Sequence, residues 1–192
     1  MVLSLRNFSH HDKAARKKVD LHEGIDSTLL ILQHRLKAKP KYPCIEVIKN
    51  YGELPQIDCY AGQLNQVFMN ILSNAIDTLE ETTEVGNLEN CNGQITITTQ
   101  LAQPRGLEEN PQVVIEIRDN GMGMDESTLN SIFDPFFTTK PIGKGTGLGL
   151  AISYQIVVEK HGGNLLCHSQ LTQGTTFEIR IPIQEASEEQ VS

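Results

Sequence analysis

The stretch AGQLNQVFMNILSNAIDTLE, residues 61–80, predicts a long helix with two chemically different faces. Apolar residues recur at the spacing of a stripe that faces a core; they are Leu64, Val67, Phe68, Ile71, Leu72, Ala75, Ile76 and Leu79. At about 100° per residue, a wedge of roughly 80° on the other side holds five polar side chains: Gln63, Gln66, Asn70, Asn74 and Asp77. The first face predicts burial, and the second requires another explanation.

Asn70 and Asn74 stand one turn apart on the polar face, although asparagine is a mediocre helix former whose amide competes for backbone hydrogen bonds. Two solvated amides are one interpretation. The other is that they supply oxygen ligands to magnesium, which takes few protein ligands and is completed by water and substrate phosphates. Neutral amides suit a site for a polyphosphate, because additional carboxylates would repel it.

Segments on both sides of this helix predict an α/β fold. Helical spacing over residues 19–36 precedes it, a buried helix is expected over Leu148–His161, and a short helix near Glu126–Ile132. Runs typical of strands are IEVIKNY (45–51), QIDCY (56–60), QITITTQ (94–100), QVVIEIRD (112–119), NLLCHSQ (164–170) and TTFEIRIP (175–182). Because strands are adjacent in pairs, we expect a two-layer α/β sandwich with a mixed sheet under helices.

Composition and charge exclude several classes of protein. With 39% hydrophobic and 21% charged residues the chain resembles ordinary soluble domains, and no apolar run reaches the roughly 18 residues of a membrane span. Residues 1–50 hold ten Lys+Arg and five Asp+Glu, whereas the remainder holds six and nineteen, a poor surface for nucleic acid. The dispersed cysteines favour reduced thiols in the cytoplasm over a zinc site or disulfide framework.

Asp119 lies in RDNGMGMD (118–125), directly after the strand VVIEI, so it is expected at a strand end beside a ligand crevice. A partly buried carboxylate needs hydrogen-bond donors. The exocyclic amino group of adenine is one such donor, whereas guanine presents an acceptor in the corresponding place. Gly121 and Gly123 would let the backbone approach the base, although an Asp-Asn-Gly turn also forms without any ligand.

The stretch SIFDPFFTTKPIGKGTGLGLA, residues 131–151, predicts an anchored lid followed by an anion site. Long irregular loops in compact domains are usually functional or disordered, and three phenylalanines at its base suggest anchoring. The glycines match neither the Walker pattern, since Gly145 follows Lys144, nor the dinucleotide fingerprint. Backbone N–H groups at a helix start near Gly147 would still attract phosphate, assisted by Lys140 and Lys144.

In their order along the chain, NQVFMNILSNAID, RDNGMG, FDPFFTTK, GKGTGLGLA and GTTFEIRIP resemble the N, G1, F, G2 and final boxes of the catalytic, ATP-binding domain of sensor histidine kinases. That superfamily, GHKL, includes the gyrase B subunit, the mismatch-repair clamp and a chaperone ATPase. The resemblance covers about residues 20–183. It implies a Bergerat ATP-binding fold, with ATP held between the asparagine helix and a lid.

The resemblance also implies roles for individual residues. Asn74 would be the main Mg²⁺ ligand with Asn70 beside it, Asp119 would bind adenine N6, and Thr175 would support Asp119. Asn70 and Lys140 are the expected catalytic residues, Lys140 as a phosphate contact. The expected ATP-binding set is Asn70, Asn74, Asp77, Asp119, Gly121, Gly123, Met124, Phe137, Thr138, Lys140, Gly143, Lys144, Gly145, Thr146, Gly147, Leu148, Gly149 and Thr175.

One position separates the subfamilies. Gyrase-like and chaperone members carry a glutamate base four residues before the magnesium asparagine, and this sequence has Asn70 there. Without a general base for water, transfer of the γ-phosphate to a protein histidine is favoured over an ATP-driven clamp. A serine-directed kinase of the same fold and a nucleotide-sensing interaction module remain alternatives. Asp77 stands where many histidine kinases have lysine, so its role stays open.

The domain boundaries and partners follow from the same resemblance. Nothing after His10 and His11 matches the phosphoacceptor continuation, so we expect residues 1–18 to end the dimerisation helix or form a linker. Residues 19–184 would be the catalytic domain and 185–192 a disordered tail. The phosphoacceptor domain and a response regulator would be partners, with no nucleic acid and no membrane contact by this fragment. The fragment would be cytoplasmic and bind ATP without autophosphorylating, whether or not its parent is membrane-anchored.

Overall fold

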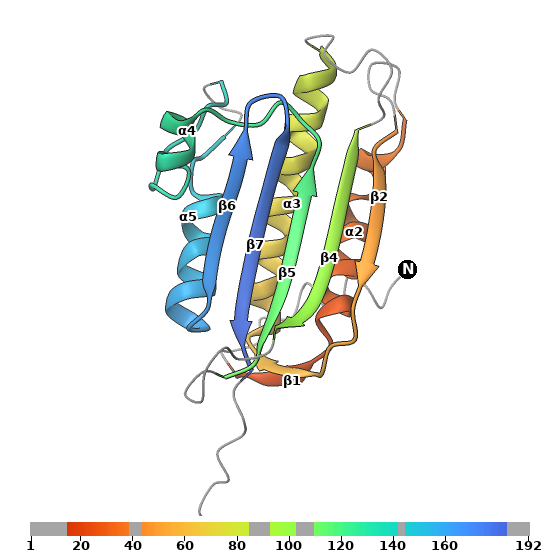
Figure 1. Ribbon diagram of the computed structural model, residues 1–192, viewed down its shortest axis with the longest axis vertical. Coiled ribbons are helices and arrows are strands. Elements are labelled where there is room, and N and C mark those ends of the chain that lie inside the picture. Colours follow the sequence, from red (N-terminus) through yellow and green to blue (C-terminus); the bar gives the residue numbers. More distant parts are fainter. Residues whose placement is uncertain (1–14, 39–43, 85–92, 103–109, 142–144, 184–192) are drawn as a thin grey trace, which may run out of the picture.

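A five-stranded mixed sheet forms one layer of the domain (Figure 1). The computed structural model describes residues 15–38, 44–84, 93–102, 110–141 and 145–183. The strand order is β2-β4-β5-β7-β6, in which β2 pairs with β4 in parallel and the other pairs are antiparallel. The strands are β2 Glu46–Tyr51, β4 Gln94–Ala102, β5 Gln112–Asp119, β6 Asn164–Gln170 and β7 Gly174–Pro182. The predicted α/β sandwich with a mixed sheet is confirmed.

Helices form the second layer, and Figure 1 shows α2 and α3 behind the sheet. The helices are α2 Leu21–Leu36, α3 Ala61–Glu84, α4 Glu126–Ser131 and α5 Gly149–Tyr154, which continues into the π-helix η1 Gln155–Lys160. The apolar stripe predicted on α3 is at most 5% exposed. It packs with the inward residues of β4 and β5, among them Ile95, Ile97, Ile115 and Ile117. Burying one face of α3 leaves its asparagines on the other.

Residues 1–18, expected to be a helix end or a linker, are described only from residue 15, and that part contains a strand and no helix. β1 (Lys17–Val19) pairs antiparallel with β3 (Ile57–Cys59) in a separate two-stranded sheet. α2 begins only after Asp20, whose side chain caps it by accepting from the N–H of His22 at 2.8 Å. β1 therefore crosses the predicted domain boundary at residues 18 and 19. Residues 1–14 and the predicted tail at 185–192 lie outside the described residues.

His161 joins the end of η1 to the start of α3. Its ring is 1% exposed, its Nδ1 donates to the carbonyl of Ile156 at 2.7 Å, and its Nε2 accepts from the N–H of Tyr60 at 3.1 Å. Since a carbonyl only accepts and a backbone N–H only donates, these two bonds fix the neutral tautomer. Burial lowers the pKa of His161 accordingly. The first residues of α3 are thus held in place by the helix that follows the glycine-rich loop.

None of the helices in the described ranges combines the length and the apolar character that crossing a membrane requires.

Candidate functional site

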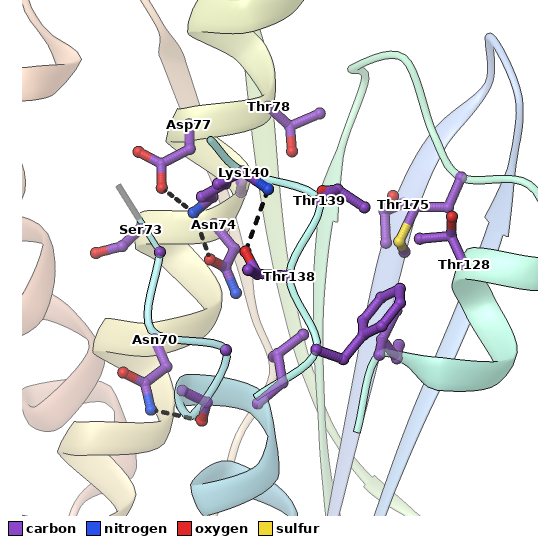
Figure 2. A pocket seen from close by; sticks show the side chains of 18 of the residues that line it. Asn70, Ser73, Asn74, Asp77, Thr78, Thr128, Thr138, Thr139, Lys140 and Thr175 are labelled. Carbon is purple, nitrogen blue, oxygen red and sulfur yellow. Dashed lines mark hydrogen bonds and ion pairs between the residues drawn. The ribbon is translucent and has the colours of Figure 1, made fainter. Parts of the chain in front are cut away.

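A cavity of about 370 Å³ lies between the polar face of α3, the ends of β5 and β7, and the loop before α5. Figure 2 shows Asn70, Asn74 and Lys140 on one side of it and Thr128 and Thr175 on the other. The predicted residues that line it are Asn70, Asn74, Asp77, Asp119, Gly123, Met124, Phe137, Thr138, Lys140, Gly145, Thr146, Gly147, Gly149 and Thr175. The fold thus brings residues that are up to about 100 positions apart in the sequence to the same cavity.

Two predicted residues do not line the cavity, and two others cannot be placed relative to it because they lie outside the described residues. Gly121 and Leu148 lie next to it in the chain but do not line the cavity. Gly143 and Lys144 fall outside the described residues. The sequence interpretation also missed several lining residues: Ser73, Ala75, Thr78, Thr128, Ile132, Thr139, Leu150 and Phe177. Helical spacing could have indicated Ser73 and Thr78, because they stand three and four residues after Asn70 and Asn74.

The two asparagine side chains are oriented by α5 and by the segment that carries Lys140. Nδ2 of Asn70 donates to the carbonyl of Gly149 at 2.8 Å and to Oγ of Ser153 at 3.2 Å, which turns its Oδ1 away from Gly149. Oδ1 of Asn74 accepts from Nζ of Lys140 at 3.1 Å. An amide oxygen that already faces an ammonium group fits a hard cation, and neutral oxygen donors are ligands that magnesium accepts.

Asp77 is bound by two cations. Its Oδ2 pairs with Nζ of Lys140, and its Oδ1 accepts from Nη2 of Arg35 on α2 at 2.6 Å. Arg35 also donates to Oε2 of Glu80 at 2.5 Å. Burial opposes the charge of Arg35, but the hydrogen bonds that it donates to the two carboxylates outweigh this effect and raise the pKa of Arg35. Asp77 thus lines the cavity with both carboxylate oxygens engaged by side chains.

Asp119 is 4% exposed and is the buried charge of the cavity. Its Oδ1 accepts from the N–H of Gly121 at 2.9 Å. Burial raises the pKa of Asp119 to about 6, while the backbone N–H groups of Gly121 and Thr175 act in the opposite direction. The carboxylate is therefore ionised at neutral pH and still lacks the hydration of a surface aspartate, so it remains a strong acceptor for a donor that enters the cavity.

The segment after Asp119 is held against the β6–β7 hairpin. Oγ of Ser169 accepts from the N–H of Met124 at 2.9 Å and bonds to Oγ1 of Thr175 at 2.9 Å. The hydroxyl of Thr175 thus bonds to Ser169. The hydrogen bond from Thr175 to Asp119 comes from the backbone of Thr175. Gly123 has a φ of +67°, and a Cβ there would lie 2.0 Å from the carbonyl oxygen of Gln170. Only glycine permits this close approach of loop and hairpin.

The loop before α5 closes on itself through a backbone bond. The N–H of Phe136 donates to the carbonyl of Gly147 at 2.9 Å. Gly147 has a φ of +66°, and a Cβ there would lie 2.4 Å from the carbonyl carbon of Phe136. The pairing places Gly145, Thr146 and Gly147 along the cavity, and the two glycines can line it only with backbone atoms. This arrangement is suited to an anion, because it offers N–H groups where a side chain would exclude the ligand.

Residues 60–185 match the sequence family described as Histidine kinase-, DNA gyrase B-, and HSP90-like ATPase. The chain belongs to this family. The match begins just before α3 and ends just after β7, so it includes the cavity and every element that lines it.

Relatives of this ATPase domain are sensor histidine kinases. Sensor kinase CckA of Brucella abortus (strain 2308) is 35% identical over 191 residues, which cover 95% of this chain and 18% of CckA. The catalytic domain of histidine kinase ThkA has a similar structure, with a TM-score of 0.68 and 25% identity over 90% of this chain and all of that domain. A structure of ThkA in complex with the response regulator TrrA has a TM-score of 0.64 and 21% identity, covering 95% of this chain and 47% of that one.

These comparisons identify the chain as the ATP-binding catalytic domain of histidine kinases. It spans less than a fifth of the length of CckA.

Proposed function

We propose that this domain binds Mg²⁺-ATP and transfers the γ-phosphate to a histidine on a separate dimerisation domain. The observation that carries the proposal is a single cavity with a buried carboxylate, Asp119, beside Thr175, and two oriented amides with a lysine on the facing side. Such a cavity is complementary to a nucleotide, which has donors on its base and negative charge on its phosphates.

Each side chain has a definite task in this proposal. Asp119 accepts the hydrogen bond of the adenine amino group, which guanine does not offer at that position. Asn74 and Asn70 would hold magnesium, which when bound neutralises phosphate charge. Lys140 then serves as a phosphate contact, and the N–H groups of residues 145–149 bind phosphate oxygens. Gly143 and Lys144 are proposed to join them.

Phosphoryl transfer depends mainly on positioning and on charge stabilisation. Asn70 occupies the place of a general base but its amide cannot accept a proton, so the site is poorly equipped to activate water. It donates instead to Gly149 and Ser153, which ties α3 to the start of α5. Asn70 therefore supports transfer to an acceptor brought by another domain over hydrolysis.

The partners of this chain are part of the proposal. The acceptor would lie on a dimerisation domain of the same kinase, and a response regulator would receive the phosphate. Support for a response regulator as partner comes from ThkA, a histidine kinase of similar fold whose structure was solved with a response regulator. We also propose that residues 19–184 form the catalytic domain and that it works in the cytoplasm.

The transfer is tested by mixing this chain with γ-labelled ATP and a separately prepared dimerising helical hairpin that bears a histidine. We expect label on the hairpin, sensitive to acid as phosphohistidine is, and little label when the chain is alone. Acid-stable label would favour a serine-directed kinase. Tight ATP binding without any transfer would contradict the kinase proposal and favour a nucleotide-sensing module.

Binding of adenosine should weaken as the pH falls through about 6, because protonated Asp119 no longer offers an ionised acceptor. We expect a loss of about fourfold between pH 7.5 and 5.5, because the ionised fraction of a group with a pKa of about 6 falls by about that factor. Adenosine is the suitable probe, since phosphate groups titrate in the same range. Calorimetry measures the affinity, and Asp119→Asn should flatten the profile. If the affinity of Asp119→Asn for adenosine falls as steeply with decreasing pH as that of the native chain, Asp119 is excluded as the titrating group.

A further inference from the structure

Arg35 reaches the candidate magnesium site from α2, an element that does not line the cavity. Its Nη2 donates to Oδ1 of Asp77 at 2.6 Å and to Oε2 of Glu80 at 2.5 Å. The side chain of Arg35 is 22% exposed, and those of Asp77 and Glu80 are 29% and 18% exposed. Partly buried ion pairs of this kind hold their geometry better than pairs on an open surface.

The second oxygen of Asp77 continues the connection. Oδ2 pairs with Nζ of Lys140, and the same ammonium group donates to Oδ1 of Asn74 at 3.1 Å, as the dashed lines of Figure 2 show. A continuous chain of charged and polar groups therefore leads from Arg35 through Asp77 and Lys140 to Asn74. The carboxylate of Asp77 cannot turn freely, because a rotation would break its ion pair with Arg35 or its ion pair with Lys140.

We propose that Arg35 is a positioning residue that sets how strongly Lys140 competes with magnesium for Asn74. By fixing Oδ1 of Asp77, Arg35 directs Oδ2 to the ammonium group of Lys140 and keeps that group at the amide oxygen. A divalent cation and an ammonium group repel each other and cannot both bind this oxygen closely. If Asn74 holds magnesium, Lys140 would have to leave the amide oxygen of Asn74, and its ammonium group would then be free to face the phosphates. This inference rests on the proposed binding of Mg²⁺-ATP.

A purely structural role is the alternative, because Arg35 also joins α2 to α3. The bond from Arg35 to Glu80 provides the control, since it links the same two helices at nearly the same length without leading to Lys140. Glu80→Gln weakens the link between the helices and leaves the Asp77–Lys140 pair in place. Arg35→Gln weakens both.

The test measures how much magnesium is needed for a non-hydrolysable ATP analogue to bind the full chain, by calorimetry over a series of magnesium concentrations. Arg35→Gln should lower the half-saturating magnesium concentration about fivefold, a coupling at the low end for linked sites. Asp77→Asn should lower it as well, and the double variant should add little, because both substitutions release the same lysine. Glu80→Gln should stay within about twofold of the native chain.

Arg35→Gln and Asp77→Asn also distinguish a positioning role of Arg35 from an effect of net charge on magnesium binding. Arg35→Gln removes a positive charge near the cavity, whereas Asp77→Asn removes a negative one. If net charge alone governed magnesium binding, the two variants would shift the half-saturating concentration in opposite directions. Shifts in opposite directions, or no shift in Arg35→Gln, would overturn the inference.

Melting temperatures identify any variant that fails to fold. Should Arg35→Gln be unfolded, Asp77→Asn decides alone: a lower half-saturating concentration supports the inference, and an unchanged or higher one overturns it. If the native chain binds the analogue without any response to magnesium, the proposed magnesium site fails, and the inference fails with it. If the native chain binds in a magnesium-dependent way and the variants need the same magnesium concentration, the inference about Arg35 is overturned while the proposed magnesium site stands.

Discussion

Asp119→Asn should lower the affinity for an ATP analogue about 100-fold, because a hydrogen bond to a buried charged group contributes about 1.5–3 kcal/mol. Asp119 is 4% exposed, and the backbone N–H groups of Gly121, at 2.9 Å, and of Thr175 do not use all of the acceptor capacity of its two oxygens. An amide at this position can present its NH₂ group to the adenine amino group, donor against donor. Calorimetry in saturating magnesium measures the loss.

The same substitution should stabilise the empty domain. The pKa of Asp119 is raised from 3.8 to about 6 on folding, so its favourable contribution is complete below 3.8 and is lost as the pH rises through about 6. At neutral pH the ionised side chain therefore destabilises the fold. We expect the melting temperature of the nucleotide-free variant to rise by about 2–5 °C. Reduced affinity together with a lower melting temperature would instead indicate a misfolded cavity, and unchanged affinity would exclude Asp119 from adenine binding.

Gly123→Ala should lower the free energy of unfolding by about 3–4 kcal/mol, one of the large effects that steric overlap in a folded chain can cause. The φ of +67° is unfavourable for alanine, and the new Cβ would lie 2.0 Å from the carbonyl oxygen of Gln170. Neither backbone segment can yield easily, because the N–H of Thr172 on the hairpin donates to the carbonyl of Met122 at 2.8 Å. Denaturation in urea measures the change.

Gly162→Ala is the matched control for this prediction. Gly162 has a φ of +63°, but a Cβ there would have no atom within 4 Å. Its substitution therefore costs only the left-handed backbone, about 1–2 kcal/mol. The difference between the two variants isolates the contact of the loop with the hairpin. Equal losses would show that this contact yields without strain.

Most of the fold could be predicted because its elements have regular patterns of adequate length. The stripe on α3 and the alternation in β7 each extend over several repeats, so periodicity alone identifies them. β1 has three residues, too few for any repeat, and its pairing with β3 depends on segments about 40 positions apart. The helix predicted over Leu148–His161 has nearly the correct bounds, yet its second half is a π-helix, which no propensity indicates.

The candidate site divides in the same way. Asn70, Asn74 and Asp119 stand in short stretches whose chemistry is unusual for their position, and the amino-acid sequence alone is enough to indicate a site there. Arg35 belongs to no such stretch, and its partner Asp77 is 42 positions away in the sequence. That ion pair arises from the packing of α2 on α3. Asp77 itself could be assigned to the cavity, but its two cationic partners could not.

The π-helix after α5 makes the length of one segment critical. Its wide turns accommodate an extra residue relative to an α-helix, and this places His161 where it reaches both Ile156 and Tyr60. Inserting a further residue between Gln155 and Lys160 would exceed the extra residue that the π turns accommodate and would rotate His161 by about 100°. Insertions are tolerated in surface loops, but the segment from Gly149 to His161 has no room for a further residue, because the first residues of α3 depend on the position of His161.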